Sequence, residues 1–277
     1  MNTFTRSYKL VKESFSVLKK DKEIILYPII SGVVSIILLG FLIAGVLSTS
    51  LFGKAGDLVM YPLLFIYYLA SYFTIIFFNT GLITCANIRM NGGDPKFRDG
   101  IGNAVKNVGK IFIWALVSAT IGIILSSLSR RSGLIGRLII GLIGMAWSLL
   151  TFFVIPVMIF ENVSVTDSIK KSGAIFKKTW GENVVGQFSI GVFFMLLALL
   201  GIVPLIIGVI SLTSGSFIPM ILFFGIAILY WVIIAIVSSS LNGVYLTALY
   251  NYASKGVVPA GFSEESIKAA WKTKGAK

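Results

Sequence analysis

Histidine is absent from the 277-residue chain, and cysteine occurs once, as Cys85. The absence of histidine removes the commonest metal ligand and the commonest general base. A single cysteine in an apolar stretch provides neither a disulfide framework nor a C-x-x-C metal or redox site. We therefore expect no metal site and no cofactor in this protein.

Charged residues are scarce, because they make up 13% of the chain while hydrophobic residues make up 56%. A soluble domain carries about 25% charged residues. The charge-free blocks are residues 24–53, 58–88, 111–129, 138–160 and 183–254. A membrane-spanning helix needs roughly 20 mainly apolar residues, and a Ser/Gly turn at residues 211–216 divides the last block in two. The sequence thus predicts an all-α bundle of six transmembrane helices, whose first apolar block is too long for a cleaved signal peptide.

Lysine and arginine lie almost entirely on one side of the predicted spans. Four of the 24 basic residues fall on the other side, and these are Lys54, Arg130, Arg131 and Arg137. Because cytoplasmic loops are enriched in Lys and Arg, this bias predicts a multi-pass protein of a prokaryotic plasma membrane with both termini in the cytoplasm. We interpret the net charge of +13 through this topology and expect no nucleic-acid binding, because the lysines are spread over four connections.

Three arginines in one short loop break this trend. Arg130, Arg131 and Arg137 follow the block 111–129, which is near the short limit for a span. We interpret them as a collar that contacts lipid phosphates at the opposite surface. The competing interpretation is a different topology around the short third span.

The segment VTDSIKKSGAIFKKTW, residues 165–180, has the pattern of a basic amphipathic helix. At 100° per residue, Ile169, Gly173, Phe176 and Trp180 share one face and the lysines lie away from it. Such a helix is typical of a headgroup boundary, where anionic lipids attract lysine. The residues that we expect to contact lipid at the cytoplasmic surface are Lys12, Lys19, Lys20, Lys170, Lys171, Lys177, Lys178 and Trp180.

The ends of this segment carry recognisable signals. Thr166 or Asp167 is a suitable N-cap, and Gly181 is a suitable stop. Glu161, just before the segment, could pair with a loop lysine.

Two further segments have the same amphipathic pattern, residues 4–20 and residues 97–112. The first has an apolar stripe of Phe4, Tyr8, Val11, Phe15 and Leu18. KESFSVLKK (residues 12–20) aligns without gaps with KKSGAIFKK (residues 170–178), and each amphipathic segment precedes two spans. We therefore predict a single domain over residues 1–277, built from three pseudo-repeats of interfacial helix, span and span at about 1–90, 91–161 and 162–256, with a cytoplasmic tail at 257–277.

Polar side chains within the spans are uncharged, which argues against an ordinary proton or sodium pathway. The second and sixth spans end alike, in FNTGLITCANIRMNGG and LNGVYLTALYNYASKG. The simpler interpretation of their polar residues is hydrogen bonding between helices. The alternative is a polar cavity near Asn79, Thr84, Asn242 and Thr247.

Enzymatic signatures such as HExxH, a P-loop or G-x-S-x-G are absent. We therefore expect a non-enzymatic, lipid-interacting or scaffold protein whose partners are membrane lipids with anionic headgroups; a protein partner is left open. The alternative is a permease or exporter for an apolar or zwitterionic small solute or lipid.

Several motifs carry a resemblance, among them FNTGLI, NGGDP, SLLTFFVIPVMIFE, KKTWGENVVG and ALYNYASKG. Together they resemble a family of uncharacterised prokaryotic polytopic membrane proteins, a domain of unknown function. The chain is also distantly similar to the membrane domain of glycerophosphoryl diester phosphodiesterases. The resemblance runs from Phe4 to about Phe262. It implies architecture and membrane location only, because the family has no assigned catalytic residues.

Overall fold

The computed structural model describes residues 3–50 and 54–264, with side chains described for residues 9–48, 59–177 and 191–264. Over this part of the chain the secondary structure is helical, without strands. The elements are α1 (Thr3–Lys20), the 3-10 helix η1 (Lys22–Ile25), α2 (Leu26–Ser50), α3 (Lys54–Met90), α4 (Phe97–Lys106), α5 (Val108–Arg131), α6 (Leu134–Leu150), α7 (Val154–Phe160), α8 (Val165–Leu200), α9 (Ile202–Thr213) and α10 (Phe217–Lys255).

Six helical stretches among the described residues are long and apolar enough to cross a membrane, which confirms the predicted number. They are Lys22–Ser48, Val59–Met90, Val108–Arg131, Leu134–Phe160, Gly191–Thr213 and Phe217–Lys255. The third is 24 residues long, longer than its charge-free block, because α5 begins at Val108, before Lys110, and includes Arg130 and Arg131 in its last turn. The predicted Ser/Gly turn at residues 211–216 is present between α9 and α10 but is limited to residues 214–216, because α9 continues to Thr213.

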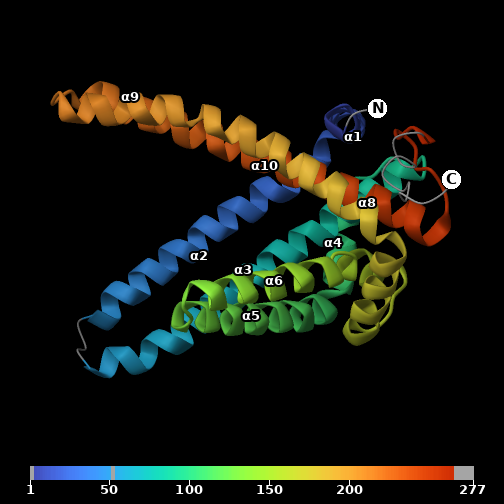
Figure 1. The fold of residues 1–277 in the computed structure, drawn as a ribbon, viewed down its shortest axis with the longest axis horizontal. Coiled ribbons are helices and arrows are strands. Elements are labelled where there is room, and N and C mark those ends of the chain that lie inside the picture. The colour runs from blue at the N-terminus through green and yellow to red at the C-terminus, as the bar shows by residue number, and fades with distance from the viewer. Residues whose placement is uncertain (1–2, 51–53, 265–277) are drawn as a thin grey trace.

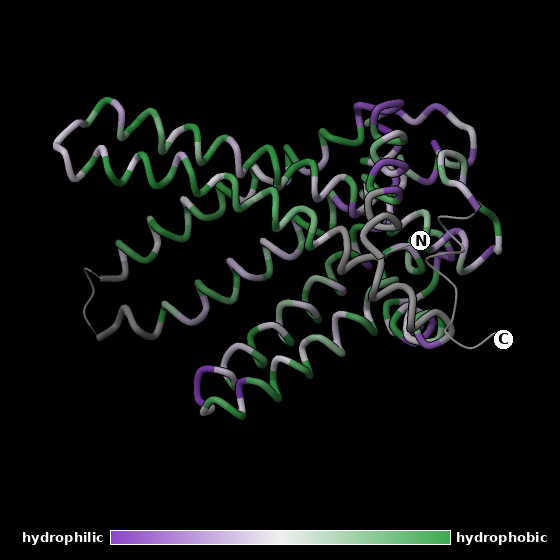
Figure 2. The backbone as a smooth tube through the Cα atoms, turned by 45° about the horizontal axis from the view of Figure 1, so that its top comes forward, coloured by the Kyte–Doolittle hydropathy of each residue, from purple (hydrophilic) through white to green (hydrophobic). Residues whose placement is uncertain are grey.

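Three helical hairpins extend from one common end of the molecule (Figure 1). The first is α2 with α3, the second is α5 with α6, and the third is α8 and α9 with α10. We call the common end, where α1, α4 and the first part of α8 lie, the base, and the ends that carry the hairpin turns the tips. The start of α1 and the end of α10 both lie at the base, and hydrophilic residues gather there (Figure 2).

Helix α1 packs against α10 and α8 through its apolar side. Leu10, Val11, Val17 and Leu18 are buried. Phe15, which the sequence places on the same stripe as Val11 and Leu18, is instead 41% exposed, and the Lys19 ammonium lies 5.2 Å from its ring centroid. The buried stripe of α1 is therefore rotated away from Phe15, and it contacts neighbouring helices.

The boundaries of the other two amphipathic segments differ from the sequence prediction. The helix expected over residues 97–112 is divided at Asn107, where α4 ends and α5 begins. Helix α8 is capped by Ser164, not by Thr166 or Asp167, because the Ser164 hydroxyl accepts the Asp167 N–H at 3.1 Å. The predicted stop at Gly181 is wrong, since α8 continues to Leu200. A glycine inside a helix costs only about 1 kcal/mol, and the apolar block that follows continues the helix.

A tyrosine joins α2, α3 and α4 at the base. The Tyr27 ring fits between Gly81 and Gly100, where a Cβ on either glycine would overlap the ring or its hydroxyl. The hydroxyl donates to the Phe97 carbonyl at 2.9 Å and lies 3.1 Å from the Cys85 Sγ. These glycines are needed for close approach of the helices.

Charged groups surround this junction on the base side. The Glu23 carboxylate accepts the Phe97 N–H, and Arg89 contacts Asp94 at 2.5 Å and Asp21 at 3.6 Å. Asp21 is 4% exposed, and burial raises the pKa of its carboxyl while the nearby Arg89 guanidinium opposes that rise. The contacts connect the start of the first span with the end of the second.

Two helix breaks are satisfied by side chains from other helices. Between α6 and α7, the buried Ser172 hydroxyl donates to the Leu150 carbonyl at 2.7 Å and accepts the Phe153 N–H at 3.0 Å. Where α8 ends, Tyr230 donates to the Leu197 carbonyl at 2.6 Å and Trp231 donates to the Ala198 carbonyl at 3.0 Å. Backbone groups freed inside a bilayer need such partners because hydrocarbon offers none.

The C-terminal parts of α3 and α10, which have similar sequences, pack against each other. Asn251 donates to the Asn87 side chain at 2.8 Å, and the absent Cβ of Gly243 leaves space for Leu82. Thr84 and Thr247 each donate to the carbonyl four residues earlier in their own helix. The two helices thus share local features, and the threefold repeat of the whole chain stays a prediction.

Substituting Gly100→Ala tests the Tyr27 junction. The new Cβ would lie 2.5 Å from the Gly81 carbonyl oxygen as well as against Tyr27, so we expect about 1–3 kcal/mol of destabilisation from overpacking. Thermal unfolding of the detergent-solubilised protein measures it. Gly102→Ala on the same helix is the control, because a Cβ there meets nothing within 4 Å. Equal melting temperatures for the two variants would contradict this account.

Substituting Ser172→Ala tests the break between α6 and α7. The change leaves the Leu150 carbonyl and the buried Phe153 N–H without their partner, and a lost partner costs about 1–3 kcal/mol. Ser168→Ala is the matched control, because Ser168 is equally buried and bonds only within its own turn, to the Ser164 carbonyl. Thermal unfolding should separate the two variants, and a smaller loss for Ser172→Ala than for Ser168→Ala would refute the role of Ser172.

Candidate functional site

The predicted lipid-contacting lysines of α1 lie on its exposed side. Lys12, Lys19 and Lys20 are all exposed, and Lys19 lies over the Phe15 ring. Since the opposite side of α1 packs on other helices, the helix presents cations and one aromatic ring outward at the base.

Helix α8 presents a second group of lysines. Lys170, Lys171 and Lys177 are exposed, and the side chains of Lys178 and Trp180 lie outside the described residues. Lys171 contacts the Glu161 carboxylate at 2.6 Å, so Glu161 pairs with a lysine as expected, but that lysine lies in helix α8 and not in a loop. The other Glu161 oxygen accepts the Tyr250 hydroxyl at 3.0 Å, so this ion pair also connects α8 with α10.

A shallow apolar groove of about 620 Å³ lies between α6 and α8. Its lining residues are Ala146, Leu149, Leu150, Gly173, Phe176 and Lys177. The groove thus combines an apolar wall with one exposed ammonium group, and it lies on the amphipathic part of α8.

The three arginines of the short loop lie at the tip of the second hairpin, away from the base. Arg130, Arg131 and Arg137 are exposed, and the Arg137 Nε donates to the Ser132 carbonyl at 3.2 Å. In Figure 2 this tip is a hydrophilic patch at the end of an otherwise apolar hairpin. The lysine groups and the arginine loop are therefore at opposite ends of the molecule.

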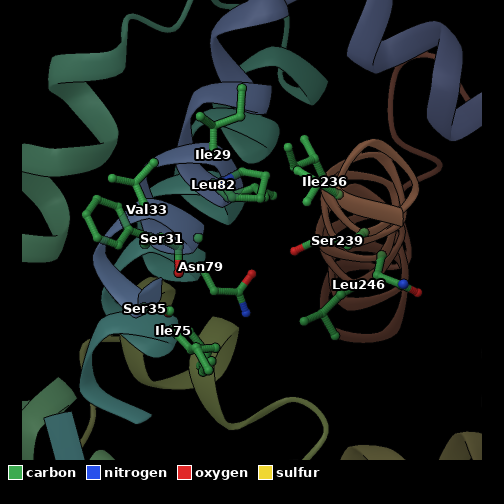
Figure 3. Close-up of a pocket in the computed structure, with 18 of the residues that line it drawn as sticks. Ile29, Ser31, Val33, Ser35, Ile75, Asn79, Leu82, Ile236, Ser239 and Leu246 are labelled. Atoms are coloured by element: carbon green, nitrogen blue, oxygen red, sulfur yellow. The ribbon is translucent and has the colours of Figure 1, made fainter. Parts of the chain in front are cut away.

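A crevice of about 850 Å³ lies between the first and third hairpins. Its walls are residues 28–36 of α2, 75–82 of α3 and 232–246 of α10, with Trp114 and residues 151–155 also contributing. Asn79 and Asn242 both line it. The Asn79 amide and the Ser239 hydroxyl point into the space from opposite walls (Figure 3).

Thr84 and Thr247, the other two residues of the predicted polar cavity, do not line this crevice. Both are buried, and each hydroxyl bonds a carbonyl of its own helix. Thr84 also accepts the Asn103 side-chain N–H at 2.9 Å. The structure therefore brings the two asparagines to one cavity and places the two threonines in helix packing.

Sequence reasoning did not single out Ser31 and Ser35, which line the crevice from α2. Their spacing of four residues places them on one helix face, and that spacing is the signal that could have found them. Among the described residues, no hydrogen-bond partner is found for the side chains of Ser31, Ser35, Asn79 or Ser239. The crevice is thus a mostly apolar space into which several unpartnered polar groups converge.

Comparison with known proteins places the chain in a family. A family model described as "Family of unknown function (DUF6159)" matches residues 58–261. A search of curated proteins and a search of solved structures each found no match. The distant similarity to the membrane domain of glycerophosphoryl diester phosphodiesterases is not supported by these comparisons. The match covers well over half of the sequence, and the chain belongs to this family of unknown function.

Proposed function

We propose that this chain is a non-enzymatic, lipid-interacting protein of a prokaryotic plasma membrane, with its base and both termini in the cytoplasm. In this proposal α1, α4 and the first part of α8 lie along the inner leaflet, and their lysines attract anionic headgroups. The arginine loop contacts phosphates at the other surface.

The observation that carries the proposal is the groove between α6 and α8. Its apolar wall matches an acyl chain, and the exposed Lys177 is placed to contact a phosphate above that chain. The exposed lysines of α1 and α8 at the base, together with the sequence bias of basic residues, support an anionic partner surface.

The second candidate function is that of a permease or exporter. The crevice favours it, because Asn79 and Asn242 line a space that a solute could occupy. A transport pathway must reach both surfaces, however. The crevice is lined by residues 28–36 of α2, which rise about 12 Å within a hydrocarbon layer of about 30 Å. We therefore favour lipid binding over transport.

Two matched charge reversals test the lipid proposal. Lys177→Glu and Lys170→Glu alter exposed lysines of the same helix, but only Lys177 lines the groove. A lysine near an anionic surface is worth about 1 kcal/mol, so we expect Lys177→Glu to weaken phosphatidylglycerol binding at least about fivefold and Lys170→Glu less. Native mass spectrometry with added lipid measures this.

Phosphatidylcholine is the control ligand, because its headgroup has no net charge. Its binding should stay unchanged in both variants. If phosphatidylglycerol binding is unaltered by either reversal, the electrostatic contact is wrong; if both reversals weaken it equally, the groove is not the site.

Reporter insertions test the orientation. We expect a green fluorescent protein fused after Lys277 to fluoresce, and alkaline phosphatase inserted at residues 214–216 or 132–133 to be active outside the cytoplasm, because positively charged ends are retained inside. A non-fluorescent fusion after Lys277, or an inactive insertion at residues 214–216, would contradict the predicted topology. An inactive insertion at 132–133 alone would place the arginine loop inside.

A further inference from the structure

The crevice between the first and third hairpins opens toward lipid. Ile29, Val33 and Ile36 of α2 and Val232 of α10 line it and are also exposed. Because these residues belong to apolar spans, the surrounding medium at the opening is bilayer hydrocarbon, and the occupant must enter from it.

The depth of the polar groups restricts what can bind. Ser31 and Ser35 lie five and nine residues into α2, or about 7 and 14 Å of helix rise. Asn79 lies on α3, 11 residues before Met90, or about 16 Å of rise. Measured from these helix ends, the groups lie below the level of the phosphates and no deeper than about the middle of the hydrocarbon layer of about 30 Å.

The chemistry of the lining excludes a charged ligand group. The lining residues include no Asp, Glu, Lys or Arg, and a charge without a counter-charge is expensive at this depth. Serine hydroxyls and the asparagine amide both donate and accept hydrogen bonds, so they match hydroxyl and ester oxygens. The volume of about 850 Å³ lies within the range of ligand pockets, about 300–1,000 Å³.

We propose that the crevice binds an uncharged lipid of the diacylglycerol class, with its hydroxyl and ester groups against Ser31, Ser35, Asn79 and Ser239 and its chains along α2 and α10. Such a lipid lacks the phosphate that would hold a phospholipid at the surface. It can therefore bring its glycerol group down to the unpartnered side chains. This site does not depend on the anionic-lipid groove of α8.

Photolabelling tests the proposal. The purified protein in nanodiscs is labelled with a diacylglycerol that carries a diazirine in one acyl chain, and cross-linked peptides are identified by mass spectrometry. We expect cross-links in residues 28–36 and 232–246, competed by unlabelled diacylglycerol and not by equal amounts of phosphatidylglycerol or phosphatidylcholine.

Two variants remove the polar groups. Asn79→Leu keeps the shape of the side chain, and Ser239→Val is a second, smaller change on the opposite wall. Each should lower the competed cross-linking at least about threefold, since a hydrogen bond in the membrane interior is lost. Ser148→Val is the matched control, because Ser148 lies outside the crevice and bonds only its own helix, to the Gly144 carbonyl. Monodisperse gel filtration of each variant excludes misfolding, and Ser239→Val alone suffices if Asn79→Leu misfolds.

Three results would overturn the proposal. They are cross-links spread evenly over all exposed helices, competition by phospholipids as strong as by diacylglycerol, and cross-linking that Ser239→Val leaves unchanged. Lys177→Glu separates this site from the proposed function, because it should weaken phosphatidylglycerol binding without changing the diacylglycerol label.

Discussion

Backbone groups inside a bilayer must find partners within the protein, and this constraint governs how the three hairpins fit together. A helix break inside a span frees carbonyl and N–H groups that hydrocarbon cannot satisfy. Ser172 serves both sides of the break between α6 and α7, and Tyr230 and Trp231 serve the end of α8. Ser172 belongs to α8, in the third hairpin, so its hydrogen bonds to the break between α6 and α7 also connect the second hairpin with the third.

In the crevice, several polar side chains also lack hydrogen-bond partners among the described residues. Ser31, Ser35, Asn79 and Ser239 converge there without hydrogen-bond partners, while Thr84 and Thr247 bond to their own helices. Polar groups in spans commonly act as contacts between helices. Several polar side chains that line one mostly apolar crevice without hydrogen-bond partners therefore indicate a ligand site more specifically than the number of polar residues in the spans does.

The number of spans could be predicted because it depends on local sequence alone. An apolar block without charged residues indicates a membrane-spanning helix, whichever helices it packs against. The sequence could not predict Ser172, because the groups that this hydroxyl binds are about 20 residues away and become free only where α6 breaks. The exposure of Phe15 could not be predicted for a similar reason. Helical spacing groups the apolar residues of α1, but it does not show which neighbouring helices α1 packs against. The likeness of the two span ends pointed to Asn79 and Asn242, which line the crevice. Thr84 and Thr247 do not line it, because each hydroxyl bonds a carbonyl of its own helix.

The divergence of the three hairpins from the base toward their tips has a mechanical consequence for the host membrane (Figure 1). Where the six apolar helices cross a bilayer, hairpins that converge at the base and separate at their tips would occupy a different lateral area in each leaflet. That asymmetry would couple the packing of the hairpins to the curvature of the bilayer.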